Sequence, residues 1–438
     1  MYSVCNKWSG NRKTSTELEI ARFLNIFSKL GKQLTIKQKF IIKKIALQYV
    51  RDINYLTKDY ESGELNQTVR GYGPNAKNVS VLTLLRLMSA FKDKEIEDWV
   101  ILLMSDNEQI VRYHALKGLK YFWNQRKTEY WNIIKNRCIV ETDGMCFNEI
   151  LLAVYPHEII INDKENVEDF CLSVMERLNA YKTKIAPEIW KVLVVIILKL
   201  IIYEDSSEAK AIVYSNINVN DFCRSLIFEI TKVIDPYREN NDYIEEPEKY
   251  KGLIIILLDL VKIRYEKMRI KNLDQDSKYD DFKIIDHLIQ QLYYTVCHGK
   301  VSNKDRSISA NHKLAFYKKI KPLISCIVEQ SVILHNGYMV AHTGYYFIQM
   351  LNDLFELDPE DILDFSNKIV LCSSKSGFTS DRTTLGEIIK LTELIITDYK
   401  EILYKKNNFS NLISILDHFS NSGWQEAMEM TWRLKEAF

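Results

Sequence analysis

The sequence is poor in glycine and proline, with 14 Gly and 7 Pro among 438 residues. Proteins rich in β-strands need many tight turns, and these two residue types supply most of them. The chain also contains no sustained alternation of polar and apolar residues, which is the pattern of a half-buried strand. These absences argue against a strand-rich fold and favour helices joined by polar loops.

An excess of charge of one sign is also missing. Lys and Arg number 59 and Asp and Glu 58, so the formal net charge is only +1. A strong overall field that would draw the chain to DNA, RNA or an anionic membrane is therefore absent, although local patches are compatible with this balance. The 47% of hydrophobic residues indicates a folded, soluble protein, and 438 residues exceed one ordinary core.

Long apolar runs are missing as well. Residues 1–16 lack the apolar centre of a signal peptide. The most apolar run, Ile189–Tyr203, is interrupted by Lys191 and Lys199 and is shorter than the roughly 20 residues that a bilayer requires. We interpret this run as a helix buried on most sides. The eight cysteines form no C-x-x-C pair, so we expect buried free thiols and a cytoplasmic protein.

What the sequence does contain is helical periodicity. Apolar residues recur at steps of three and four along almost the whole chain. Counting the segments gives about 20 helices, or ten pairs of about 40 residues, which is the period of helical-repeat arrays. Four sites carry the signals of a helix start: Thr35 with Gln38, Asp106 with Gln109, Ser422 with Gln425, and Asp358-Pro359.

The segment DNEQIVRYHALKGL shows this pattern in detail. Asp106 is placed to cap a helix by accepting from backbone N–H groups two and three residues on. Val111, Ala115 and Leu119 follow at steps of four and line one face, where the small Ala115 lets two helices cross closely. Arg112 lies beside this stripe, within reach of an acid in a neighbouring repeat.

These five residues resemble the second helix of a HEAT repeat in their order and spacing. The resemblance is close only over about Lys94–Trp123, and the other segments match in length and periodicity. It implies an all-α fold, a right-handed α-solenoid of about ten HEAT-like helical pairs, built as one array or as two halves. An ordinary helical hairpin is the alternative, and the motif itself indicates no chemistry.

Two polar segments predict the domain boundaries. Residues 59–78 contain three glycines and a proline, and residues 235–250 are acidic with two prolines. Loops of this length are uncommon inside a compact domain. We therefore expect an N-terminal helical segment and linker at 1–75, a HEAT-like array at 76–235 and a C-terminal helical array at 251–438.

A second resemblance covers more of the chain. Residues 130–154 and the tail from Asn336 look like the helical C-terminal regions of large bacterial anti-phage defence proteins, which often carry an NTPase and an effector domain. This resemblance implies a helical arm, either a separate subunit or a region of a larger assembly. The matching tail residues are packing and capping residues, so no active site is implied: Gly344, Asp358-Pro359, Gly423-Trp424, Ala427 and Leu434 to Phe438.

Motifs for catalysis are missing. The sequences that begin at Gly71 and Gly299 lack the lysine-serine end and the preceding strand of a phosphate-binding loop. His157-Glu158 is not followed by the second histidine of a zinc-protease helix, and no G-x-S-x-G is present. We therefore expect a protein that is not an enzyme and that holds no cofactor or metal.

One aromatic segment is a candidate ligand patch. His335 and His342 are seven residues apart, with Tyr338, Tyr345 and Tyr346 nearby. An aromatic stripe at helical spacing is more typical of a core, so the packing interpretation is favoured.

Two charged clusters were also candidates for contact with a ligand. Asp280-Asp281 are adjacent carboxylates, which do not share a helix face, and a solvated loop is the favoured interpretation. Lys300, Lys304 and Arg306 form the clearest basic loop of the chain and are a candidate contact for phosphates, although an aspartate lies between them.

The predicted function is therefore binding without catalysis, because stacked helical pairs present an extended surface. We expect a protein partner and no membrane. The second resemblance implies a sensor, scaffold or regulatory subunit or region of a bacterial anti-phage system, whose partner is another subunit or a phage protein. Two alternatives stay open. One is a nucleic-acid-binding HEAT-like protein similar to the alkylpurine DNA glycosylases, which the balanced charge disfavours. The other is a purely structural subunit.

Overall fold

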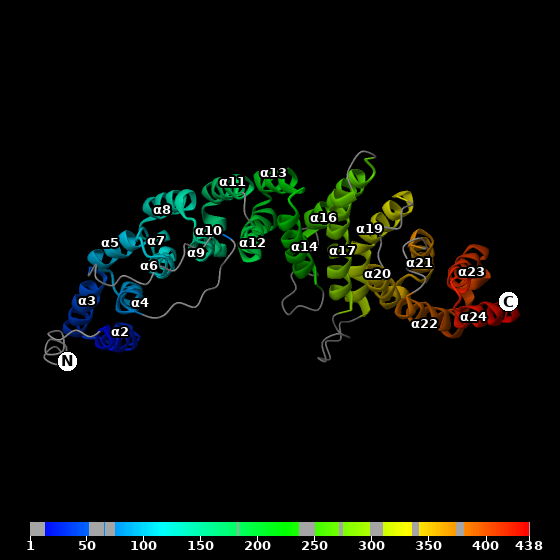
Figure 1. The fold of residues 1–438 in the computed structure, drawn as a ribbon, viewed down its shortest axis with the longest axis horizontal. Helices are drawn as coiled ribbons and strands as arrows, with labels where there is room; N and C mark the ends of the chain where they lie inside the picture. Colours follow the sequence, from blue (N-terminus) through cyan, green and yellow to red (C-terminus); the bar gives the residue numbers. More distant parts are fainter. Residues whose placement is uncertain are drawn as a thin grey trace. The chain divides into compact units, whose positions relative to one another are not determined.

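The computed structural model describes residues 14–51, 65, 75–181, 184–235, 250–270, 275–297, 310–334, 341–373 and 381–437. Within these ranges the chain forms 21 α-helices, three short 3-10 helices and no β-strand (Figure 1). The all-α fold predicted from the scarcity of glycine and proline is confirmed for this part of the chain.

The chain divides into two compact units, Met1–Val213 and Tyr214–Phe438. The division falls inside α13 (Ser207–Asn216), ahead of the acidic residues 235–250 at which the sequence predicted a boundary. Helices α2 (Thr14–Ser28) and α3 (Ile36–Arg51), expected as a separate N-terminal segment, pack against α4 (Ala76–Ala90) within the first unit.

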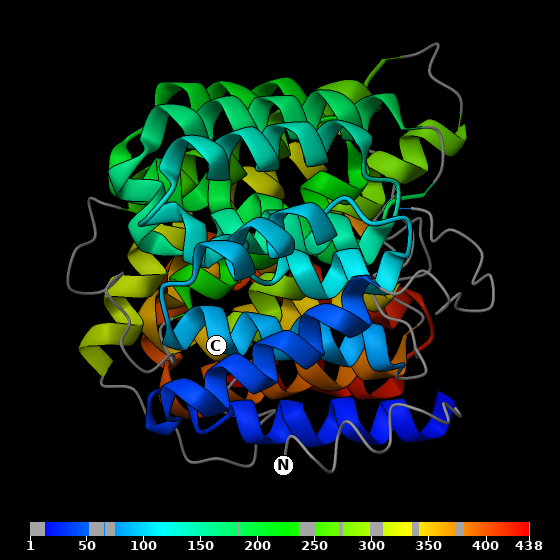
Figure 2. The same ribbon diagram turned by 90° about the vertical axis from the view of Figure 1, so that its left-hand side faces the viewer.

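The first unit stacks its helices in sequence order (Figures 1 and 2). One row, in which each helix packs on the next, consists of α4, α6 (Gln109–Leu116), α9 (Gly144–Val154) and α12 (Pro187–Glu204). The helices beside this row are α5 (Lys94–Leu103), α7 (Leu119–Trp123), α8 (Lys127–Val140), α10 (His157–Asn162) and α11 (Lys164–Ala180). Within this second set, α7 packs on α8 and α8 on α11, so the unit has two layers.

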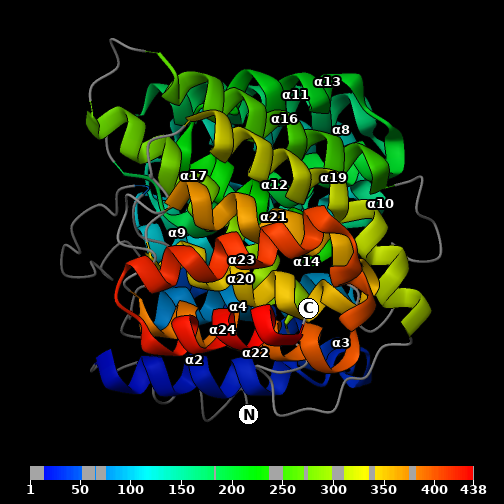
Figure 3. The same cartoon turned by 90° about the vertical axis from the view of Figure 1, so that its right-hand side faces the viewer.

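The second unit is built in the same way (Figures 1 and 3). One row consists of α14 (Asn220–Ile234), α17 (Gln275–Val296), α20 (Ala341–Leu354), α22 (Arg382–Asp398) and α24 (Gln425–Ala437). The other row consists of α16 (Lys251–Met268), α19 (Ala310–Leu334), α21 (Pro359–Ser373) and α23 (Lys406–Asn421). The short helices η3 (Phe355–Leu357) and η6 (Lys400–Tyr404) precede α21 and α23. Helices that stack in sequence order define an α-solenoid, so the predicted fold class is confirmed.

Local sequence signals explain several helix boundaries. Thr35 and Gln38 form the predicted capping box: the Thr35 N–H donates to Gln38 Oε1 at 2.8 Å, and the Gln38 N–H donates to Thr35 Oγ1 at 3.3 Å. Pro359 is the first residue of α21, as predicted. The box predicted at Ser422 is wrong, because Ser422 ends α23 and Gly423, with φ of 94°, makes the turn into α24.

The apolar run that begins at Ile189 forms most of α12, and nine of the residues of this helix are buried, including Trp190. Its burial on most sides is confirmed. None of the helices in the described part of the chain is long and apolar enough to cross a membrane.

The adjacent carboxylates Asp280 and Asp281 lie in α17 rather than in a loop. Asp280 is exposed and pairs with Lys283 at 3.0 Å, as a surface residue does. Asp281 is only 5% exposed and pairs with Arg264 of α16, which also donates to the Asn220 side chain at 2.9 Å. The prediction of a solvated loop is therefore wrong, and Asp281 ties two helices of the second unit together.

Candidate functional site

The residues of the HEAT-like motif lie at the junction of α4, α6 and α9. Asp106 Oδ1 accepts from the backbone N–H of Glu108 at 2.9 Å, but α6 begins at Gln109 with Glu108 as its N-cap residue. The helix thus starts two residues later than a cap at Asp106 would require. Lys77 Nζ of α4 lies 3.0 Å from a carboxylate oxygen of Asp106 and 2.9 Å from one of Glu108. Asp106 therefore shapes the turn before α6 and links it to α4.

The apolar stripe of the motif is divided between two helices. Val111 and Ala115 lie in α6, Leu119 begins α7, and all three are fully buried. Gly118 stands at the break, where a Cβ atom would lie 2.5 Å from the Leu85 side chain of α4. Any other residue at this position would therefore force the Leu85 side chain to shift.

Arg112 reaches a carboxylate of the next helical pair. Its Nε and Nη2 atoms donate to the two oxygens of Glu141 at 3.0 and 2.9 Å. Glu141, which ends α8, also pairs with Arg137, and its backbone carbonyl accepts from Arg177 of α11. Burial alone would raise the pKa of Glu141, but the hydrogen bonds and charges of Arg112 and Arg137 lower it below its usual value. An ionised, buried Glu141 thus fixes α6, α8 and α11 relative to one another.

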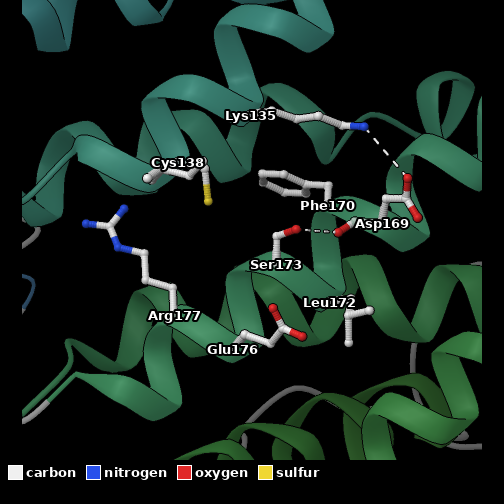
Figure 4. Close-up of a pocket in the computed structure, with 9 residues that line it drawn as sticks. Lys135, Cys138, Asp169, Phe170, Leu172, Ser173, Glu176 and Arg177 are labelled. Atoms are coloured by element: carbon white, nitrogen blue, oxygen red, sulfur yellow. Dashed lines mark hydrogen bonds and ion pairs between the residues drawn. The ribbon is translucent and has the colours of Figure 1, made fainter.

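Beside this arginine cluster, α8 and α11 leave a cavity of about 540 Å³ between them (Figure 4). Cys138 and Phe170, both buried, belong to its lining. Ile139 and Leu172 also line it but are 70% and 50% exposed. The cavity therefore joins an apolar interior to two exposed apolar side chains. We call it the α8–α11 cavity.

Charged side chains stand at opposite ends of the α8–α11 cavity (Figure 4). Lys135 Nζ lies 3.7 Å from the carboxylate of Asp169 at one end. At the other end, Arg177 carries a buried Nη1 atom that has no hydrogen-bond partner among the described residues. Leaving such a donor unsatisfied costs about 1–3 kcal/mol.

The cavity has the chemistry of a binding site. Burial raises the pKa of the Cys138 thiol to about 11, although the charge of Arg177 acts in the opposite direction, so the thiol is protonated at neutral pH and is a poor nucleophile. Among the described residues, no group of three or more His, Cys, Asp or Glu side chains is arranged to hold a metal ion. What the lining offers is apolar surface, a hydrogen-bond donor and two weakly paired charges.

The remaining predicted site residues lie mostly outside the described part of the chain. This holds for the basic loop of Lys300, Lys304 and Arg306. It also holds for His335, Tyr338 and the side chain of His342 in the aromatic patch.

The two tyrosines of that patch on α20 are described. Tyr346 packs on Tyr293 and Tyr294 of α17 with ring centroids 4.7 and 6.0 Å apart, and Tyr345 lies 5.7 Å from Tyr346. Tyr293 is 7% exposed and Tyr294 is 41% exposed, so this cluster extends from the core of the second unit to its surface.

Sequence reasoning missed the α8–α11 cavity, although one signal was present. The buried stripe of α8 contains Tyr130, Ile134 and Cys138 at steps of four. Ile139 and Val140 follow directly and fall off this stripe, and both are more than half exposed. Apolar residues outside the packing face of an amphipathic helix were the available indication of a binding surface.

No protein-family model matches the chain, and no curated protein matches it in sequence. Among solved structures, the chain is similar to one chain of a structure whose description concerns nuclear import complex assembly. That description states that Kap95p binding induces the switch loops of RanGDP to adopt the GTP-bound conformation. The match has a TM-score of 0.35 and 11% sequence identity, and it covers 97% of this chain and 64% of that chain. This chain thus spans less than two thirds of the length of the chain that it matches. A likeness at this level carries no argument, so the solenoid assignment rests on the packing of the helices.

Proposed function

We propose that this chain is a non-catalytic, cytoplasmic helical-repeat protein that binds a protein partner, and that a segment of the partner occupies the α8–α11 cavity. One observation carries the proposal: Ile139 and Leu172, 70% and 50% exposed, stand at a cavity that the buried Cys138 and Phe170 also line. Exposed apolar side chains around a concavity are characteristic of sites for partner side chains.

An apolar side chain of the partner would enter between α8 and α11 and cover Ile139 and Leu172. Removing the exposed area of these two side chains from water contributes about 2–3 kcal/mol in all. A carbonyl or carboxylate oxygen of the partner segment would lie near the positive charge of Arg177, which belongs to the lining of the cavity. The site would then gain specificity from Arg177 and affinity from the apolar contact.

The finer form of the proposal is a sensor, scaffold or regulatory subunit or region of a bacterial anti-phage defence system. Only the resemblance of residues 130–154 and of the tail from Asn336 supports it. The partner would then be another subunit of that system or a phage protein.

The proposal is tested by using the full chain as bait in three forms: wild type, the double variant I139S/L172S and the control variant I333S. Ile333 lies in α19 of the second unit and is 54% exposed, so I333S removes comparable apolar surface at another place. We expect a protein that is retained by wild type and I333S and that binds I139S/L172S at least tenfold more weakly once purified. Equal binding of that protein to all three forms would show that the cavity is not its site.

A further inference from the structure

Helices α2 and α3 expose more apolar surface than packing within the chain explains. Phe23 and Ile26 of α2 are 47% and 62% exposed, Leu30 in the turn after α2 is 44% exposed, and Ile36 and Phe40 of α3 are 84% and 63% exposed. We call these five side chains the α2–α3 surface. Figure 2 looks onto these two helices at one end of the first unit.

These side chains form two stripes at helical spacing. The first stripe begins with Phe23 and Ile26 on α2 and continues with Leu30 just past the end of that helix, at steps of three and four. The buried residues Ala21, Leu24 and Ser28 lie on the opposite face of α2. The second stripe occupies the first two turns of α3. The 3-10 helix η1 (Gly31–Gln33) separates the end of one stripe from the start of the other. Helix α2 thus has two apolar faces, of which one packs within the chain.

The same region carries a strong positive charge. Residues 14–51 contain eight Lys and Arg residues and two Glu residues, which gives +6, whereas the whole chain carries +1. Several of these cations are paired: Arg22 with Glu19, Lys43 with Asp93, and Arg51 with Glu95. Three others lie in or beside η1, are exposed, and form no ion pair with the described residues: Lys29, Lys32 and Lys37.

We propose that the α2–α3 surface binds an acidic amphipathic helix of a protein partner. Elsewhere in the array, the apolar face of each helical pair is covered by the next pair. Helices α2 and α3 are the outermost described pair of the first unit, and a partner helix packed on their exposed apolar side chains would extend the stack. Apolar side chains of that helix at steps of three and four pack between the two stripes. Its acidic side chains then meet Lys29, Lys32 and Lys37, the three lysines in or beside η1.

The charge pattern favours such a helix over an anionic membrane. Glu19 lies one turn before Phe23 on the same face of α2 and is 67% exposed in its pair with Arg22. A carboxylate in line with the apolar stripe is repelled by an anionic bilayer, whereas one basic residue of a partner helix pairs with it. The inference goes beyond the proposed function, because the α2–α3 surface and the α8–α11 cavity lie on different helices.

The test uses the full chain and a labelled designed peptide as probe. The peptide is helical, with leucine at i, i+3, i+4 and i+7 and glutamate at most other positions, and a scrambled peptide of the same composition is the reference. Fluorescence anisotropy measures both. We expect the helical peptide to bind at least tenfold more tightly than the scrambled one. The variants F23S/I26S and K29E/K32E/K37E should each weaken this binding at least tenfold, and I139S/L172S should leave it unchanged.

Several results would overturn the inference. Equal binding of the two peptides would do so, and so would binding that neither variant weakens. A full chain that binds neither peptide would also do so, even where another part of the chain covers the surface. Sedimentation with phosphatidylserine vesicles that both variants abolish would assign the surface to a membrane. A dimer in sedimentation equilibrium that F23S/I26S dissociates would assign it to a second copy. Because the lysine variant alters only exposed side chains, its melting temperature checks that a loss of binding does not reflect unfolding.

Discussion

Replacing Glu141 with glutamine perturbs the buried carboxylate that links three helices of the first unit. Glu141 is 1% exposed and accepts from Arg112 at 2.9 and 3.0 Å, and it also pairs with Arg137. Glu141→Gln keeps the shape of the side chain but leaves both arginines without their counter-charge. Removing one partner of a buried ion pair costs about 3–5 kcal/mol. We expect about 3 kcal/mol, because the Arg112 and Arg137 side chains are 12% and 13% exposed and water screens part of the repulsion.

Hydrogen exchange of the backbone amides is the appropriate assay, because a chain of two units need not unfold in one step. A loss of about 3 kcal/mol corresponds to exchange that is about 100-fold faster in α6 and α8, which carry the two arginines. The matched control is Glu129→Gln, which removes an acid that is 47% exposed in its pair with Arg126 and costs at most about 1 kcal/mol. Equal changes in the two variants would refute the role assigned to Glu141.

The same variant has a predictable pH dependence. The folded-state pKa of Glu141 is lowered, so its ionised form stabilises the fold above the unfolded-state pKa of about 4.3. That contribution disappears as the pH falls below about 4 and through the folded-state pKa. Wild type should therefore lose protection in α6 and α8 in acid, and E141Q should lack this part of the loss. Parallel acid profiles of the two proteins would contradict the assignment.

Further predictions concern single positions. Gly118→Ala should destabilise the first unit by about 1–3 kcal/mol, because its Cβ would lie 2.5 Å from the Leu85 side chain. The control Gly252→Ala, whose Cβ would have nothing within 4 Å, should be neutral or stabilising by up to about 1 kcal/mol. Thermal melts compare the two variants. Asp106→Ala should cost about 0.5–2 kcal/mol by removing the side chain that shapes the turn before α6. An unchanged melting temperature would count against the role of Asp106 in this turn. Cys138 should react slowly with a thiol reagent at pH 8 and rapidly in urea, and fast reaction in the native protein would contradict its burial. Purified protein should hydrolyse no nucleotide, and sustained turnover would overturn the proposal of a non-enzyme.

The fold class was readable from the sequence because helical periodicity is a local property. The box at Thr35 and Gln38 and the proline at Pro359 are likewise local, and both were predicted. The late start of α6 was not predicted, because Asp106 also forms an ion pair with Lys77, a residue of another helix. The break at Gly118 depends in the same way on the approach of Leu85.

The candidate site was less readable, since it depends on pairs of residues that are distant in sequence. The sequence indicates that Asp281 is a surface acid, because its partner Arg264 of α16 is brought beside it only by the fold. The α8–α11 cavity depends on how far apart two helices stand, and no spacing in the sequence encodes that separation. Only the apolar Ile139 and Val140, which follow the buried Cys138, indicated that α8 had a second face to cover.

Photo-crosslinking shows directly whether a segment of the partner occupies the α8–α11 cavity. A photoreactive amino acid is placed at Leu172 in the full chain, and in a matched protein at Ile333, and each is irradiated with the partner retained by the wild-type bait. We predict a single crosslinked segment of the partner at Leu172 and none at Ile333. The crosslink at Leu172 should be lost when Ile139 is replaced by serine. Crosslinks of equal yield at both positions, or none at Leu172 while the partner stays bound, would contradict this prediction.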